Sequence, residues 1–304
     1  MSKSGSKKKK TSNKKLLALS ISLSAIIIFG FITYKMLFQN GEIKFSLKAV
    51  IVDQLSEHFP NATFIARATN LLIDAGFSVS YFSSESVDVP FYKQLVEGNY
   101  GIIILRVHSA VRVGEPLVDF FTSEEYDGSK YYEYRRDGLL SKAEYFEPFG
   151  QETGKFYFAI TPKFIERFGN FPKSIIIAMG CSSLNVSGMA QAFISRNAKA
   201  YVGWTNIVLA NDTDHETIKL LDMFLDKNAT LASSISATDR HNYYDPNKGI
   251  RIISYMDFYP VSQSIGDLKI SDLIAEAKNP KTLFTGADQL SFLIANCKPR
   301  ERQN

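Results

Sequence analysis

The 304-residue chain lacks several features that mark common functional classes. It has two cysteines, Cys181 and Cys297, which are too few for a disulfide scaffold and stand at no metal-ligand spacing. Its first predicted strand is followed by the turn Asp53-Gln54-Leu55-Ser56 rather than by a glycine-rich phosphate loop. These absences argue against a disulfide-rich module, a zinc protein and a flavodoxin-like domain with a phosphate-bearing ligand. We expect neither a metal nor a cofactor.

The chain also lacks an excess of positive charge outside its first 15 residues. The formal net charge is +4, but a lysine cluster precedes the first apolar run: Lys3, Lys7, Lys8, Lys9, Lys10, Lys14 and Lys15. The remainder is close to neutral or slightly acidic, so the folded part lacks the excess of basic residues typical of proteins that bind nucleic acids. Hydrophobic residues make up 45% and charged residues 22% of the chain, which allows a globular domain with a sizeable core.

What the chain does have is a long apolar run near its N-terminus. Residues 16–34 read LLALSISLSAIIIFGFITY, 19 residues without a charge, and a helix needs roughly 20 to cross a bilayer. The lysine cluster stands before this run, and only Lys35, Lys44 and Lys48 follow it closely. The preference of positive charge for the cytoplasmic side predicts a cytoplasmic N-terminus, one membrane span that contacts lipid, and an extracellular main domain at the cell membrane.

Two alternatives to this anchor stay open. A cleaved signal peptide has the same order of basic and apolar regions, but its apolar part spans about 7–15 residues, and residues 31–36 offer no small-x-small cleavage site. A buried soluble helix is rarely apolar on every face for five turns. We therefore divide the chain into a basic tail (1–15), an anchor (16–34), a tether (35–46), an α/β domain (47–268) and a C-terminal helix and tail (269–304).

From residue 47 onward, short β-branched runs alternate with segments of helical periodicity. The predicted strands are 47–52, 77–82, 101–107, 174–179 and 200–204. The predicted helices are 61–75, capped by Asn61, then 91–96, 187–196, a longer helix capped by Asp212, and 272–278. Such alternation is typical of βαβ units, so we expect an α/β fold with a mostly parallel sheet between two helical layers.

A long interruption separates the third and fourth predicted strands. Residues 112–173 are rich in tyrosine and phenylalanine and break the βα rhythm. A structureless loop of that length is rare in a compact domain. We expect an insertion that contains a β-ribbon or hairpin, packed partly over the carboxyl edge of the sheet.

Two chemically reactive side chains follow predicted strands directly. His108 comes after 101–107, and Cys181 comes after 174–179 and Gly180. Functional residues of open α/β sheets lie at the carboxyl ends of strands, so neighbouring strands would bring both to one edge. An imidazole there can activate a thiol, and the backbone N–H groups of Ser109 and Cys181 could bind an oxyanion.

Plainer interpretations of these residues also stay open. Free cysteine is among the most buried residue types, and a histidine after a strand is often a structural hydrogen-bond partner. In an oxidising compartment, a disulfide between Cys181 and Cys297 is a further alternative.

The segments around both residues resemble those of a known family. Residues 102–109 (IIILRVHS) resemble the strand-then-His-Gly block of caspase-like cysteine peptidases, and residues 175–183 (IIIAMGCSS) resemble their strand-then-Cys block. Residues 190–193, 197–204 and 212–224 then resemble a helix, strand and helix of gingipain-like and CHAT-type members. The similarity runs in order over residues 47–240, so the chain resembles clan CD peptidases of the caspase–haemoglobinase fold.

The resemblance implies hydrolysis of peptide bonds in a protein or peptide substrate through an acyl-thioenzyme, without a metal in the chemistry. His108 would be the general base and Cys181 the nucleophile. In relatives an acidic residue near the position of Asp53 can line a pocket for an arginine or lysine side chain, which would direct cleavage after basic residues. The alternative is that Asp53 caps a nearby loop or helix.

Two departures from the family pattern support a second hypothesis. Ser109 stands where the family usually has glycine, so its side chain could narrow the approach to the oxyanion site. His108 and Cys181 are 73 residues apart, because the insertion lies between them and either gates the site or blocks it. The second hypothesis is an inactive caspase-like domain that serves as a binding or scaffold module.

Overall fold

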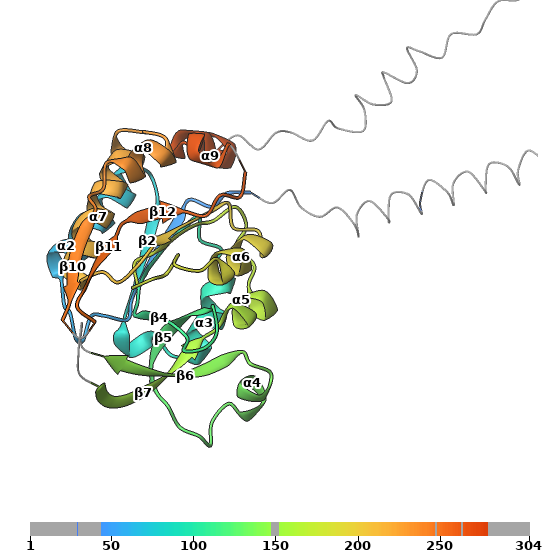
Figure 1. Cartoon of the computed structure of the whole chain (residues 1–304). Coiled ribbons are helices and arrows are strands. Elements are labelled where there is room, and N and C mark those ends of the chain that lie inside the picture. Colours follow the sequence, from blue (N-terminus) through green and yellow to red (C-terminus); the bar gives the residue numbers. More distant parts are fainter. Residues whose placement is uncertain (1–28, 30–43, 147–151, 247, 263, 279–304) are drawn as a thin grey trace, which may run out of the picture. The chain divides into compact units, whose positions relative to one another are not determined.

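A mostly parallel six-stranded sheet forms the centre of the described structure (Figure 1). The computed structural model describes residues 29, 44–146, 152–246, 248–262 and 264–278. The sheet has the spatial order β12 (Met256–Phe258), β9 (Ala200–Trp204), β8 (Ile175–Ala178), β3 (Ile102–Arg106), β1 (Lys48–Asp53) and β2 (Ser78–Ser83). The edge strand β12 is antiparallel to β9, and all other pairs are parallel. The chain is thus a mixed α/β protein, as the alternating pattern predicts.

Successive side chains of each strand enter two different cores. In β1, Ala49 and Ile51 join one buried cluster, while Val50 and Val52 join the other. The first core lies beneath α2 (Ala62–Asp74), α7 (Ala210–Leu221), α8 (Leu231–Ser236) and α9 (Ile270–Lys278). The second lies beneath α3 (Val89–Glu97), α5 (Pro162–Phe168) and α6 (Gly188–Ser195). Helices therefore cover both faces of the sheet (Figure 1), which explains why the central strands β1, β3, β8 and β9 are apolar over most of their length.

Helix starts follow local capping chemistry, with one exception. The Asn61 side chain accepts a hydrogen bond of 3.0 Å from the Phe64 N–H, so the predicted cap of α2 is confirmed. The predicted cap of α7 is wrong, because this helix begins after Leu209 and Asp212 lies within its first turn. There the Asp212 carboxylate accepts a hydrogen bond of 2.7 Å from the Tyr243 hydroxyl, a distant partner that the local sequence does not reveal.

The residues of the predicted insertion form a second, antiparallel sheet. Its spatial order is β4 (Ser109–Val111), β5 (Val118–Glu125), β7 (Glu152–Ile160) and β6 (Leu140–Phe146), with α4 (Tyr132–Arg136) between β5 and β6 along the chain. The sheet starts at Ser109, immediately after His108, and therefore begins slightly before the predicted boundary. Phe120, Phe158 and Ile160 from this sheet belong to the core beneath α3, α5 and α6.

Several shorter elements complete the described part of the chain. The hairpin β10 (His241–Asp245) and β11 (Ile250–Ser254) was not predicted, and its inner residues Tyr243 and Ile252 are buried. Short 3₁₀ turns lie at Ser84–Ser86 and Ile265–Asp267, and a π-helical turn, Asp222–Asp226, follows α7.

The predicted membrane anchor at 16–34 lies, apart from Phe29, outside the described residues. Within the described residues, no helix combines the length and apolar character needed to cross a membrane. The described residues from 44 to 278 belong to one compact unit.

Candidate active site

A cavity of about 490 Å³ lies where the carboxyl ends of the central strands meet the second sheet. It includes residues that follow β1, β3, β8 and β9, together with residues of the second sheet and the first turn of α7. The chain leaves β1 toward β2 on one side and reaches β3 on the other, so the strand order reverses beside β1. Ligands of open α/β sheets bind at such a reversal, outside the carboxyl ends of the strands. The cavity is therefore the leading candidate for a functional site.

His108 and Cys181 both line this cavity. Strands β3 and β8 pair directly and in parallel, with Ile102 opposite Ile175 and Leu105 opposite Ala178. Because the strands run in the same direction from matched starting points, the residues that follow them emerge at the same edge. The structure thus brings the two residues that the sequence singled out into one cavity.

His108 is held in an apolar surrounding at the end of β3. Its backbone N–H donates a 2.9 Å hydrogen bond to the Gln54 side-chain oxygen, and its carbonyl accepts one of 2.9 Å from the Phe121 N–H. The rings of Phe59 and Phe121 lie beside its ring, with centroids 6.0 and 5.9 Å away. Burial lowers the pKa of His108 from 6.5 to about 3, and the nearby charges of His58 and Arg106 act in the same direction. At neutral pH the imidazole is therefore uncharged and can accept a proton.

The Cys181 thiol contacts the backbone of the loop before α7. Its Sγ donates to the Val208 carbonyl at 3.2 Å, and the Val208 N–H approaches Sγ at 3.5 Å. Burial raises the pKa of Cys181 above its usual 9.0. The resting pair is thus a neutral thiol and a neutral imidazole rather than a thiolate–imidazolium ion pair. Transfer of the thiol proton to His108 requires the S–H to leave Val208.

A direct contact joins the segments that carry the two residues. The Ser109 hydroxyl donates a 2.6 Å hydrogen bond to the Cys181 carbonyl. Gly180 lies so close that a Cβ at this position would stand 2.3 Å from the Ser109 hydroxyl and 2.5 Å from the Val107 carbonyl. The Ser109 hydroxyl therefore ties the segment after β3 to the turn after β8. Ser109 and Cys181, whose backbone N–H groups are predicted to bind the oxyanion, both line the cavity.

Asp53 has a different environment from the predicted substrate pocket. It is 1% exposed, does not line the cavity, and its carboxylate lies 2.6 Å from the Arg106 guanidinium and 3.2 Å from the Tyr81 hydroxyl. Burial raises the pKa of Asp53, while Arg106 opposes that shift. Arg106 also binds Asp214 at 2.7 and 2.9 Å and the Phe59 carbonyl at 2.7 Å. The Asp53 carboxylate is therefore paired with an internal guanidinium and does not line the cavity as a partner for a basic substrate side chain.

The sequence reasoning missed several residues of the cavity wall. Leu55 and Phe59 follow β1 at the same sheet edge as His108, so the rule that identified His108 could have found them as well. Phe121 comes from the insertion and Val208 from the loop before α7. No local signal marks these last two residues, because only the three-dimensional arrangement brings them to the cavity.

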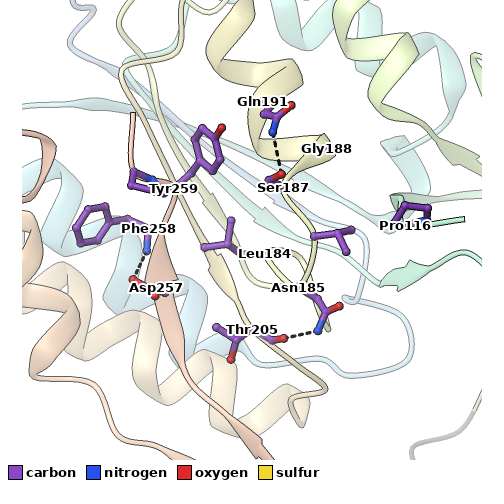
Figure 2. A pocket seen from close by; sticks show the side chains of 12 residues that line it. Pro116, Leu184, Asn185, Ser187, Gly188, Gln191, Thr205, Asp257, Phe258 and Tyr259 are labelled. Carbon is purple, nitrogen blue, oxygen red and sulfur yellow. Dashed lines mark hydrogen bonds between the residues drawn. The ribbon is translucent and has the colours of Figure 1, made fainter. Parts of the chain in front are cut away.

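A second cavity, of about 650 Å³, lies around the start of α6 (Figure 2). Its polar groups bond to one another: the Gln191 amide donates to the Ser187 hydroxyl at 2.8 Å, and the Asn185 amide donates to the Thr205 carbonyl at 2.8 Å (Figure 2). Asp257 accepts from the Phe258 N–H at 2.8 Å. No cysteine or histidine is among the residues described as lining it, whereas His108 and Cys181 both line the first cavity.

Neither cavity contains an evident metal centre in the part of the chain that the structure describes. No group of three or more histidine, cysteine, aspartate or glutamate side chains there could hold a metal ion. Cys181 is a free thiol, and Cys297 lies outside the described residues, so the alternative disulfide stays a prediction.

Comparison with known proteins gives no assignment: no family model matches the chain, and no curated protein matches it.

Proposed function

We propose that the chain is a thiol-dependent hydrolase of the caspase-like type that cleaves peptide bonds with Cys181 and His108. The observation that carries this proposal is the delivery of both side chains into one cavity by adjacent parallel strands, β3 and β8. The segment resemblances supply the family, the caspase–haemoglobinase fold, and the roles of nucleophile and base. The apolar run at 16–34 adds anchorage in the cell membrane, with the catalytic domain outside.

The neutral resting pair defines the order of the chemical steps. The Cys181 S–H leaves the Val208 carbonyl and gives its proton to a His108 ring nitrogen while the sulfur attacks the substrate carbonyl carbon. The carbonyl π electrons move onto oxygen, which develops negative charge. When the C–N bond breaks, its electron pair leaves with nitrogen, which takes the proton from the imidazolium, and a thioester stays on Cys181. Water, deprotonated by His108, then attacks the thioester, and the carboxylic acid leaves as the thiol regains its proton.

The burial of His108 favours the transfer of a proton from the imidazolium to the leaving nitrogen. An imidazole whose pKa is about 3 is a weak base but, once protonated, a strong acid for the departing amine. Negative charge on the sulfur and on the developing oxyanion would raise that pKa during the reaction, since opposite charges stabilise the imidazolium. The backbone N–H groups of Ser109 and Cys181 are the donors assigned to the oxyanion.

Covalent labelling of the full-length chain in detergent, under reducing conditions, tests the proposal. Peptide acyloxymethyl ketones form a thioether with a catalytic cysteine and release a carboxylate, so intact mass and peptide mapping locate the adduct. We expect one adduct, at Cys181, that is lost in Cys181→Ser and retained in Cys297→Ser. His108→Gln should slow labelling by about 100-fold or more, the typical contribution of a general base.

A small alkylating agent supplies the control for access to the thiol. If iodoacetamide modifies Cys181 while no peptide ketone does and a peptide library stays uncleaved, the hydrolase proposal is wrong.

The second candidate is a binding or scaffold domain without hydrolytic activity. The burial of Cys181 favours it, because burial raises the pKa of the thiol and keeps the sulfur protonated, although the hydrogen bond with the Val208 backbone opposes that shift. A Cys181→Ser chain that retains the cellular phenotype of the wild type would support this candidate.

A further inference from the structure

We infer that the first cavity selects a substrate with a large apolar side chain, such as leucine, phenylalanine or methionine, next to the carbonyl that Cys181 attacks. This inference rests on the proposed function and names its substrate class. It replaces the basic-residue preference that Asp53 suggested.

The cavity surface nearest the reactive pair is apolar. The rings of Phe59 and Phe121 lie beside the His108 ring. Met179 precedes Cys181 by two residues, and the Val208 carbonyl contacts the Cys181 sulfur. The side chains of Phe121, Met179 and Val208 are at most 6% exposed, so they are fixed parts of the wall. No lysine or arginine is among the described residues that line the cavity.

Two carboxylates also line the cavity, but neither provides a strong site for a cation. Asp212 accepts a 2.7 Å hydrogen bond from Tyr243, lies 3.5 Å from the His241 ring and is 32% exposed. Glu144 is also partly exposed. An ion pair with a partly exposed carboxylate contributes about 0–1 kcal/mol, whereas burial of a leucine or phenylalanine side chain contributes about 1.5–3 kcal/mol. The same carboxylates repel an acidic side chain, so the expected order of preference is apolar, then basic, then acidic.

The cavity has room for such a group. Its volume of about 490 Å³ lies within the roughly 300–1,000 Å³ typical of small-ligand sites. One large side chain would leave space for the adjoining backbone to reach Cys181.

The test compares three acyloxymethyl ketones that differ only at the residue next to the ketone: leucine, arginine or aspartate. Their rates of Cys181 labelling in the full-length chain are divided by their rates with glutathione, which removes differences in intrinsic reactivity. We expect the leucine compound to label at least ten times faster than the arginine compound, and the aspartate compound to be slowest.

The outcomes separate this inference from the proposed function. Faster labelling by the arginine or aspartate compound overturns the inference and leaves the hydrolase proposal intact. Equal corrected rates for the three compounds also overturn the inference. Labelling by none of them, while iodoacetamide still modifies Cys181, overturns both.

A charge introduced into the wall gives an independent measurement. Ile207 lines the cavity and is partly exposed, so Ile207→Glu adds a carboxylate without emptying a core position. We expect this variant to raise the arginine-to-leucine labelling ratio by about tenfold, while the neutral, equally sized Ile207→Gln does not. Ile250→Glu makes the same change at an exposed residue of β11 that does not line the cavity, and it should leave the ratio as in the wild type. Equal effects of Ile207→Glu and Ile250→Glu would contradict the inference.

Discussion

At the scale of single residues, burial among apolar side chains sets the protonation state of His108. The rings of Phe59 and Phe121 exclude water from it, and the resulting loss of hydration disfavours the charged form. The backbone N–H is fixed by Gln54, so the residue is positioned through its main chain. At neutral pH the imidazole is therefore uncharged, and it becomes a better proton acceptor when negative charge develops beside it during the reaction.

The lowered pKa of His108 predicts a pH-dependent contribution to stability. Between pH 6.5 and about 3 the unfolded chain carries a proton on this residue and the folded chain does not. The contribution is therefore fully present above pH 6.5 and is lost as the pH falls toward 3. Between pH 4 and 5.5 the unfolding free energy of the wild type should fall more steeply than that of His108→Gln, by up to about 1.4 kcal/mol per pH unit.

Urea denaturation of the full-length chain in detergent, at steps of half a pH unit, measures these slopes. His215→Gln is the matched control, because the side chain of His215 is exposed and keeps its water on folding. If His108→Gln and the wild type lose stability in parallel over this range, His108 is not buried in its neutral form.

The residue scale also shows which parts of the site the sequence can reveal. His108 and Cys181 were found because each follows a strongly apolar strand, and strand ends are visible in a single sequence. The same rule pointed to Asp53, yet this carboxylate turns to Arg106, which is 53 residues away, and shares it with Asp214, which is 108 residues from Arg106. The neighbouring residues in the sequence do not show whether a carboxylate at a strand end faces a cavity or forms an internal ion pair.

At the scale of elements, the end of β8 depends on the absence of a side chain at residue 180. A Cβ there would meet both the Val107 carbonyl and the Ser109 side chain at less than 3 Å. The Val107 carbonyl belongs to the backbone just after β3, so it cannot move aside as the end of a flexible side chain could. Gly180 therefore allows the turn that carries Cys181 to lie against the segment that carries His108.

Gly180→Ala should separate these two segments. We expect a loss of about 1–3 kcal/mol of unfolding free energy, the usual cost of overpacking, and at least tenfold slower labelling of Cys181 by the leucine ketone. Gly128→Ala is the control, since a Cβ at that position meets no atom within 4 Å. Unchanged labelling in a folded Gly180→Ala variant would show that this close contact does not position the thiol.

Predictability at this scale follows the strength of the local signal. The buried parallel strands were predicted to within a residue or two at most ends, because β-branched runs such as residues 175–178 leave little ambiguity. The β10–β11 hairpin was missed because its strands are short and half exposed, which gives a weak pattern. The start of α7 was misplaced because the helix begins without a side-chain cap, and its acidic residue serves a different partner.

At the scale of the whole molecule, a buried charge cluster connects elements that the sequence shows only as separate segments. Arg106 at the end of β3 binds Asp53 at the end of β1 and Asp214 in α7, and Asn61 before α2 donates to Asp214 at 2.9 Å. These contacts hold the carboxyl edge of the sheet, where the first cavity opens. The βα alternation predicts the sheet and its helices, but the strand order and this cluster depend on tertiary contacts that a pattern of apolar residues does not encode.

The remaining whole-molecule prediction concerns the apolar run at 16–34, which lies almost entirely outside the described residues. Its length and lack of charge predict a stable membrane span. The full-length chain should stay in the membrane fraction after extraction with alkaline carbonate, whereas a chain lacking residues 16–34 should become extractable. Deletion of residues 1–15 alone is the matched control, since it removes the lysine cluster and keeps the apolar run.

The lysine cluster predicts the orientation of that span. In intact cells an added protease should reach the domain that begins near residue 44, because this side of the span is expected to be extracellular. Digestion only after the cells are permeabilised would reverse the orientation and place the proposed site in the cytoplasm. A mature protein that lacks residues 1–34 by mass would instead identify the run as a cleaved signal peptide. Because the positive residues set the direction, the chain without residues 1–15 should be digested less completely in intact cells than the full-length chain.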